Sequence, residues 1–299
     1  MNNMDQKSLA ILGGDDRELI LIKELIKKGY YIQVFGFPVQ MLPPGTAVYS
    51  TIAGATSKVD TIILPMPGIN QNGLLYAKYA ETKVTVSMQD FAQVPKGTRV
   101  FVGKASQYLI ELANMVGFKI VEVGDLDEIA IPNSIPTAEG AIQLAMEKLP
   151  ITIHSSQTFI TGFGRVAETL AWMLKGLGAH ITVVARNPVQ LAKCRILGYR
   201  AEELKNLKMI VGEADLLFNT VPAMVIDKDI LAHMNKETVI IDLASSPGGT
   251  DFQAAKELGI YASLALGLPG KVAPVTAGRI LSEVYPVMIH DVVPKSTNS

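Results

Sequence analysis

Short apolar runs alternate with segments of helical periodicity along most of the chain. In the first half these runs are rich in β-branched and aromatic residues, which is typical of strands buried on both faces. The predicted strands are residues 8–12, 30–35, 61–64, 99–102 and 118–123. Helical spacing predicts helices at residues 18–28 and 107–116 and a short helix at 74–80. About five parallel strands with helices between them indicate a Rossmann-like or flavodoxin-like domain.

The second half repeats the alternation. Its predicted strands are residues 158–161, 181–185, 215–218, 238–241 and 260–265. Its predicted helices are residues 137–149, 189–197, 204–211, 226–234 and 275–290, with a further helix that ends at Gly176. The fold class is therefore α/β, with two Rossmann-like parallel-sheet domains and an interdomain cleft as the expected substrate site.

Residues 125–136 are expected to separate the two domains. This stretch is acidic at first and then contains Pro132 and Pro136, and proline interrupts helices. We therefore expect residues 1–130 to form a substrate domain and residues 131–274 to form a NAD(P)-binding domain. The C-terminal segment 275–299 would return to brace the first domain.

The strongest motif lies between residues 158 and 186. A predicted strand leads into Gly162, Gly164 and Ala167, which have the spacing of a dinucleotide-binding turn, and a helix and a second strand follow. Gly162 permits the tight turn, Gly164 leaves room for a pyrophosphate, and the helix N-terminus attracts the anion. The alternative is a glycine-rich turn in another kind of α/β protein. The predicted cofactor-binding residues of this turn are Gly162, Phe163, Gly164, Arg165 and Val166.

The end of the second strand distinguishes NADP from NAD. An acidic residue there would bind the ribose 2′-hydroxyl of NAD, but this chain has Arg186 followed by Asn187. A guanidinium pairs well with a 2′-phosphate, so the sequence favours NADP and leaves NAD open. The alternative is that Arg186 is merely exposed to solvent. Thr220, Val221 and Pro222 end a later strand, where we expect contacts with the cofactor's ribose and nicotinamide.

The first strand ends in Gly13-Gly14-Asp15-Asp16-Arg17, which is not a dinucleotide motif because its two acids would repel a pyrophosphate. Asp15 or Asp16 can simply cap the following helix. Alternatively, the glycines and Arg17 form part of a pocket for a small anion. Lys104 follows a later strand, where it either binds a carboxylate beside a helix start or is a solvated lysine.

Composition narrows the range of partners. The formal net charge of −1 gives no general attraction to nucleic acid or to an anionic membrane. No apolar run has the length of a membrane span, and the N-terminus lacks the apolar segment of a signal peptide. Cys194 is the only cysteine, which excludes an intrachain disulfide and fits a reducing cytoplasm. The four histidines show no metal-ligand spacing, so no metal is expected.

Six motifs over nearly the whole chain form a recognisable set: GGDDRE, IPNSIPTAEGAIQLAM, TGFGRVAETLA, NTVPAMV, DLASSPGG and ALGLPGKVAPVTAG. This set resembles the family of dipicolinate synthase A subunits of spore-forming bacteria. The resemblance implies oxidation of dihydrodipicolinate to dipicolinate with a nicotinamide cofactor. It also implies a flavoprotein-like partner, the B subunit of dipicolinate synthase, and a place in the sporulating mother cell. Whether the chain also forms a homo-oligomer stays open.

The implied reaction removes a hydride and a proton and yields an aromatic ring. The protein must then mainly position the ring over the nicotinamide and neutralise two carboxylates. The candidates for substrate binding are Arg17, Lys104, Ser245, Ser246 and Lys271. The candidates for catalysis are Asp15, Asp16 and Lys104, although no general base stands out.

Two other functions are compatible with the sequence. A D-2-hydroxyacid dehydrogenase has the same two-domain plan, but its hallmarks are an arginine after the fifth strand and a later glutamate–histidine pair. Here Ser245 and Ser246 occupy the loop after the fifth strand, and the sequence GLPGKVAP contains no histidine. A cofactor-binding scaffold or regulatory subunit that is inactive alone would explain why no base stands out.

Overall fold

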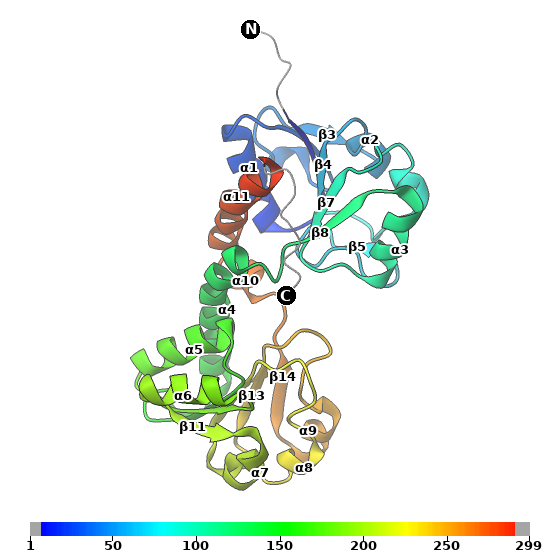
Figure 1. Cartoon of the computed structure of the whole chain (residues 1–299). Coiled ribbons are helices and arrows are strands. Elements are labelled where there is room, and N and C mark those ends of the chain that lie inside the picture. The colour runs from blue at the N-terminus through cyan, green and yellow to red at the C-terminus, as the bar shows by residue number, and fades with distance from the viewer. Residues whose placement is uncertain (1–6, 291–299) are drawn as a thin grey trace. The chain divides into compact units, whose positions relative to one another are not determined.

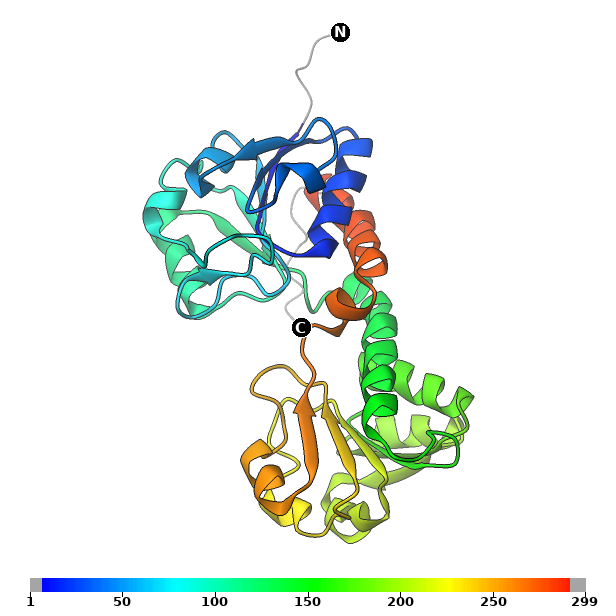
Figure 2. The same cartoon turned by 180° about the vertical axis from the view of Figure 1, so that it is seen from behind.

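The computed structural model describes residues 7–290, and the chain divides into two compact units. The first unit comprises residues 1–132 and 273–299, and the second comprises residues 133–272 (Figures 1 and 2). Each unit contains one six-stranded parallel sheet. The part of the predicted bracing segment between 291 and 299 lies outside the described residues.

The sheet of the first unit has the strand order β3-β2-β1-β4-β7-β8. Counted along the chain this is the order 3-2-1-4-5-6 of a Rossmann fold, not the 2-1-3-4-5 order of a flavodoxin-like fold. The prediction counted about five strands, and the sheet has six, the short edge strand β3 lying within a stretch rich in proline and glycine. The strands are β1 (Ser8–Leu12), β2 (Tyr31–Phe35), β3 (Ala47–Tyr49), β4 (Thr61–Ile63), β7 (Arg99–Val102) and β8 (Lys119–Glu122).

The short helix predicted at residues 74–80 is wrong. Leu74–Leu75 forms β5, which pairs antiparallel with β6 (Val84–Thr85). The backbone groups that follow β5 bond to other loops, because the Tyr76 N–H donates to the Gly68 carbonyl and the Tyr76 carbonyl accepts from Gly14. These groups are therefore not available for the hydrogen bonds of a helix.

Helices cover both faces of the first sheet. On one face α2 (Ile52–Ala55) and α3 (Gln107–Val116) contribute to a core of valine, leucine and phenylalanine side chains. On the other face α1 (Asp16–Lys27) packs against α11 (Pro274–His290), so the end of the described chain returns to the first unit (Figures 1 and 2). Gly278 permits the close approach of the two helices, because a Cβ at this position would lie only 2.6 Å from the carbonyl oxygen of Arg17. Short 3₁₀ turns are η1 (Val39–Met41) and η2 (Met88–Phe91).

The linker expected around residues 125–136 is instead the first part of a long helix, α4 (Asp127–Lys148). Pro132 and Pro136 both lie within it, although each removes a backbone hydrogen bond. Packing outweighs this loss, since Ile129 is buried in the core of the first unit and Ala138 and Ala141 are buried in the core of the second. The change from one unit to the other, between residues 132 and 133, thus falls inside a helix.

The sheet of the second unit has the order β11-β10-β9-β12-β13-β14, which is again the Rossmann order. On one face lie α4, α5 and α6, and on the other α7, α8 and α9 (Figures 1 and 2). The strands are β9 (Gln157–Thr161), β10 (His180–Ala185), β11 (Arg200–Glu203), β12 (Leu216–Asn219), β13 (Val239–Asp242) and β14 (Tyr261–Leu264). The helices are α5 (Arg165–Gly176), α6 (Pro188–Ile196), α7 (Leu207–Ile210), α8 (Lys228–Leu231), α9 (Phe252–Leu258) and α10 (Leu268–Val272), with 3₁₀ turns η3 (Leu204–Asn206) and η4 (Val211–Glu213).

The strand β11 and the helices α9 and α10 of the second unit were not predicted. The strand β11 has the sequence RAEE, whose charged side chains give no apolar run, and it sits at the edge of the sheet, where such residues are tolerated. The helix α9 has only seven residues, too few for a clear periodicity.

The packing of α11 on α1 leads to a stability prediction. Leu281 is 1% exposed, and its truncation to alanine should destabilise the first unit by about 2–5 kcal/mol because it leaves a cavity. Val287 lies on the same helix and is 59% exposed, so Val287→Ala should change stability by only about 0.5 kcal/mol. Urea denaturation followed by circular dichroism measures both. Equal effects of the two substitutions would show that α11 does not pack as described.

Candidate functional site

The turn after β9 has the conformation that a dinucleotide site needs. Gly162 has φ +85°, which disfavours other residues, and a Cβ there would lie 2.6 Å from Thr220 Oγ1. The Gly162 N–H donates to the Val184 carbonyl at 2.9 Å, which ties the turn to the neighbouring strand β10. Glycine is thus required at this position by the protein itself, before any ligand is considered.

Gly164 is the residue that leaves the space for a ligand. It is the N-cap of α5, it is exposed, and no atom lies within 4 Å of the position that its Cβ would take. No side chain caps this helix, whose N-terminal end carries a partial positive charge. An open helix start with glycine as its cap fits a pyrophosphate.

The other residues of the turn differ in what they can offer. The Phe163 side chain is 2% exposed and packs into the core, with its ring centroid 6.2 Å from that of Tyr199. Only the backbone of Phe163 can therefore face a cofactor. Arg165 and Val166 are half-buried in the first turn of α5.

Arg186 and Asn187 follow β10, and both are exposed. The Asn187 side chain caps α6, since its Oδ1 accepts from the Val189 N–H at 2.8 Å. Within residues 7–290 the Arg186 side chain makes no hydrogen bond or ion pair, and no acid ends β10. Arg186 is thus exposed at the strand end where the cofactor's ribose binds in Rossmann folds.

The loop after β12 is held by a buried polar clamp that the sequence did not predict. The Asn219 amide oxygen accepts from Thr161 Oγ1 at 2.6 Å and from the Val221 N–H at 3.0 Å. Its amide nitrogen donates to the Val221 carbonyl and to Asp242 Oδ1, each at 3.0 Å. Thr220 bonds to the Thr161 carbonyl through both its N–H and its hydroxyl. Pro222 follows on the exposed part of the loop.

Asp242 extends this clamp to the loop after β13. Its carboxylate accepts from Asn219, from the backbone N–H groups of Ala244 and Gly249, and from the Thr250 hydroxyl. A Cβ on Gly249 would overlap the carbonyl oxygen of Val221, so the two loops are in contact. The clamp thus links the ends of β9, β12 and β13.

The predicted substrate residues of the second unit are all exposed. Ser245 and Ser246 lie on the loop after β13, and Lys271 lies in α10. No hydrogen bond joins any two of them in the described part of the chain. Their predicted role stays a prediction.

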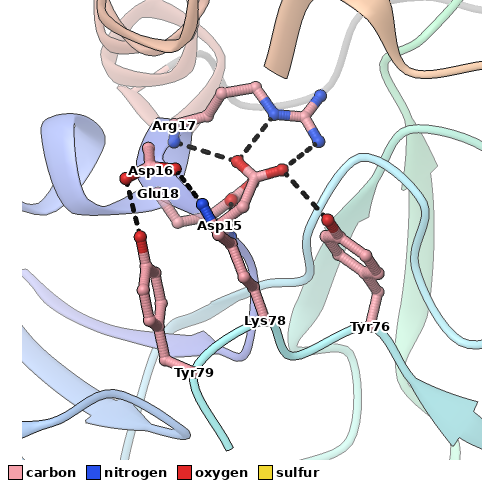
Figure 3. A network of polar contacts seen from close by, with 7 residues as sticks. All are labelled: Asp15, Asp16, Arg17, Glu18, Tyr76, Lys78 and Tyr79. Atoms are coloured by element: carbon pink, nitrogen blue, oxygen red, sulfur yellow. Dashed lines mark hydrogen bonds and ion pairs between the residues drawn. The ribbon is translucent and has the colours of Figure 1, made fainter. Parts of the chain in front are cut away.

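A cluster of charged residues lies at the start of α1 in the first unit (Figure 3). Asp15 is the N-cap of α1, and its carboxylate accepts from Arg17 Nε and Nη2, each at 2.9 Å, and from the Arg17 N–H at 3.0 Å. Both side chains are buried, at 6% and 8% exposure. Arg17 is thus already paired with an internal carboxylate, which weakens its predicted role as an anion receptor.

Asp16 forms a second, more exposed set of contacts. Its carboxylate accepts from Lys78 Nζ at 2.5 Å and from the Tyr79 hydroxyl at 2.6 Å (Figure 3). The Tyr76 hydroxyl makes a long hydrogen bond of 3.4 Å to Asp15 Oδ2. The segment that was mispredicted as a helix therefore supplies three side chains to this cluster.

Glu18 is the third buried charged residue here. Its carboxylate accepts from the Asp15 N–H at 2.7 Å and completes a capping box with Asp15. Burial raises the pKa of Glu18 to about 7, and the nearby Asp15 adds to this, although Arg17 opposes it. The spacing Asp-x-x-Glu is the sequence signal for a capping box, but it does not reveal the burial.

The two aspartates have the opposite shift. Burial alone would raise the pKa of Asp15, but its hydrogen bonds and ion pair with Arg17 outweigh burial and lower it. Hydrogen bonds from Lys78 and Tyr79 lower the pKa of Asp16. Both residues are thus weak proton acceptors, which argues against either as a general base.

Lys104 lies elsewhere in the first unit. It is exposed just beyond β7, and Ser106 caps the following helix α3. The Ala105 N–H donates to the Glu122 carboxylate at 2.7 Å. No hydrogen bond connects Lys104 to the Asp15 cluster in the part of the chain that the structure describes.

Comparison with known protein families gives one match within each of the two units. A family model described as the N-terminal domain of the dipicolinate synthase A subunit matches residues 8–124. The dipicolinate synthase A subunit of Bacillus subtilis (strain 168) is 37% identical over 287 residues, which cover 95% of this chain and 96% of that protein. The chain belongs to the family of dipicolinate synthase A subunits.

Solved structures extend this family relationship. The crystal structure of the dipicolinate synthase A subunit from Bacillus halodurans matches with a TM-score of 0.90 and 34% identity, covering 96% of this chain and 98% of that one. An L-alanine dehydrogenase has the same fold, with a TM-score of 0.63 at 15% identity over 94% of this chain and 89% of that one. The alanine dehydrogenase/PNT C-terminal domain model matches residues 134–259, which indicates that the second unit of this family member binds a nicotinamide cofactor.

Two further kinds of feature are absent from the described residues. No helix within residues 7–290 is long and apolar enough to cross a membrane. The same residues contain no group of three or more histidine, cysteine or acidic side chains arranged to hold a metal ion.

The pKa of Glu18 leads to a prediction about pH. The folded-state pKa of about 7 lies above the ordinary value of 4.5, so the native state binds more protons between these two pH values. The contribution of Glu18 to the free energy of unfolding is complete below pH 4.5 and is lost as the pH rises through 7. A rise of the pKa from 4.5 to about 7 makes this loss about 3 kcal/mol. Glu18→Gln should therefore become more stable than the wild type as the pH rises from 4 to 8.

Thermal unfolding at several pH values measures the stability difference between Glu18→Gln and the wild type. Glu24→Gln is the matched control, because Glu24 lies at the surface of the same helix and pairs with Lys27 at 2.8 Å. A difference for Glu18→Gln that does not change with pH would mean that Glu18 is ionised in the normal acidic range.

Proposed function

We propose that this chain oxidises dihydrodipicolinate to dipicolinate and passes the hydride to NADP, acting together with a flavoprotein-like B subunit. The reaction and the existence of a partner are inferred from the name of the Bacillus subtilis relative, which is one subunit of a dipicolinate synthase. The nicotinamide cofactor is supported by the alanine dehydrogenase/PNT domain model. The observation that carries the proposal is the open, glycine-capped start of α5 at the end of β9.

The residues of the second unit have separate roles in this proposal. The bound NADP would accept the hydride from the substrate ring. Gly162 shapes the turn, and the backbone at Gly164 and the first turn of α5 bind the pyrophosphate. Arg186 pairs with the 2′-phosphate, with Asn187 beside it. The clamp on Asn219 fixes the loop that presents Thr220, Val221 and Pro222 to the nicotinamide side.

The first unit supplies groups for a dicarboxylate in this proposal. The candidates of this unit to bind a substrate carboxylate are Arg17 and Lys104. The second unit has its own candidates, Ser245, Ser246 and Lys271. The lowered pKa values of Asp15 and Asp16 make them poor acceptors for the released proton. Their role in this proposal is to hold Arg17 and Lys78 in place. Aromatisation of the ring provides much of the driving force, so a strong base is not required.

Arg186 tests the choice of cofactor. Arg186→Asp should weaken NADP binding by about a hundredfold and NAD binding by much less, since a carboxylate repels the 2′-phosphate but can accept from a 2′-hydroxyl. Fluorescence titration with NADPH and NADH gives the two dissociation constants. An unchanged ratio between them would exclude Arg186 as the phosphate-binding residue.

Gly164 tests the cofactor site itself. Gly164→Val fills the open space at the start of α5 and should abolish binding of both cofactors. Gly176→Val is the matched control, because Gly176 ends the same helix and also has no atom within 4 Å of its Cβ position. Normal NADPH binding by Gly164→Val would mean that this turn is not the pyrophosphate site. Oxidation of dihydrodipicolinate by the chain alone, and with the B subunit, then distinguishes an enzyme from a scaffold subunit.

A further inference from the structure

Glu18 is a buried acid that the fold does not need in charged form. It is 1% exposed and lies beside Asp15 and Arg17, which already form a complete ion pair. Burying a further carboxylate costs free energy, and a glutamine could accept the same hydrogen bond of the capping box. Ionisable groups that are kept in such costly positions at the ends of sheet strands are frequently functional.

The backbone before α1 is shaped around this side chain. Gly14 has φ +121°, and a Cβ there would lie 2.6 Å from Glu18 Cδ and Cγ. The Glu18 carboxylate accepts from the Asp15 N–H, while the Asp15 carboxylate accepts from the N–H and the guanidinium of Arg17. A change of charge at Glu18 therefore acts directly on the turn that positions Asp15 and Arg17.

Asp15 connects this buried group to a pocket on the surface. Its carboxylate accepts from the Tyr76 hydroxyl (Figure 3). Tyr76 also lines a pocket of about 550 Å³ in the same unit. Lys78 lines the same pocket and pairs with Asp16, and Gly68 and Lys83 also border it. The charged residues of its lining are the two lysines and one acid, Glu81, so positive charge predominates there, which suits a small anion with more than one acceptor group.

The charge of the cluster depends on Glu18 alone. The Asp15–Arg17 and Asp16–Lys78 pairs are each neutral, so ionised Glu18 leaves one uncompensated negative charge, and protonated Glu18 leaves none. The groups that face Glu18 are Asp15 and Arg17 from its own helix, the phenol of Tyr76 and the phenol of Tyr285 on α11. Neither phenol ionises near neutral pH, because burial raises the pKa of both Tyr76 and Tyr285.

We propose that Glu18 is a positioning residue that sets the affinity of the first unit for a small dicarboxylate. The dicarboxylate binds in the pocket lined by Tyr76 and Lys78, and its binding causes Glu18 to take up a proton. This inference rests on the proposed function, which supplies the dicarboxylate as the substrate class. A dianion beside the pocket disfavours the ionised form of Glu18, so binding and protonation strengthen each other. Binding should therefore be tighter at pH 6 than at pH 8.

The experiment uses the full chain and pyridine-2,6-dicarboxylate as the probe. Isothermal titration calorimetry at pH 6, 7 and 8 should show affinity falling on the order of tenfold over this range, the size expected for one uncompensated charge near a dianion. Repeating the titration in buffers of different ionisation enthalpy should show net uptake of protons at pH 7. This measurement needs no variant, so it does not depend on how a substitution affects folding.

Glu18→Gln identifies the group that takes up the proton. It should bind the probe at every pH as tightly as the wild type does at pH 6, with no proton uptake from this site. Glu24→Gln should behave like the wild type, and both variants should bind NADPH normally, because the cofactor residues lie in the second unit. Circular dichroism confirms that each variant is folded.

Two different negative results are distinguishable. If the wild type binds the probe without proton uptake, or if Glu18→Gln keeps the full pH dependence, the role of Glu18 is excluded while the proposed function stands. If the wild type does not bind the probe at any pH, the dicarboxylate itself is excluded as a ligand of this chain, and both proposals fail together.

Discussion

The contact between the loops at the carboxyl ends of β9, β12 and β13 is the constraint on which the proposed cofactor site depends. Asn219 and Asp242 are completely buried, and between them they bond to Thr161, to the backbone at Val221 and to Gly249. Buried polar groups of this kind are costly unless every partner is present, so the clamp allows one arrangement of the loops. The open start of α5 is positioned by the same contacts, because Gly162 lies against Thr220.

In the first unit, charged side chains occupy the corresponding turn. The β1 turn has the same position in its sheet as the glycine turn in the second unit, but it holds Asp15, Arg17 and Glu18 where a phosphate would otherwise bind. Two sheets with the same strand order thus have opposite properties at corresponding ends. One end is open and has the positive end of a helix, and the other is filled by internal ion pairs. This difference supports the proposal that the second unit binds the dinucleotide.

Most strands and long helices were predictable because apolar periodicity reports burial directly. The errors are equally physical. Residues 74–80 have an apolar pattern, but their backbone bonds to the loops at Gly14 and Gly68, which are distant in sequence. The prolines of α4 suggested a linker, yet packing of Ile129 and Ala138 in two different cores keeps the helix continuous. Neither effect is encoded within the segment itself.

The sequence by itself determined the two α/β units, the glycine turn and the arginine after β10, because each depends on the order of residues within about thirty positions. The tertiary structure alone decided which charged residues are neutralised. The sequence offered Arg17 for a small anion and Asp16 as a helix cap or a base. In the structure Arg17 pairs with Asp15, and Asp16 bonds to Lys78 and Tyr79. It also decided that Glu18, an ordinary capping residue in the sequence, has a pKa of about 7. Burial and long-range pairing set these properties, and both depend on neighbours that the local sequence does not specify.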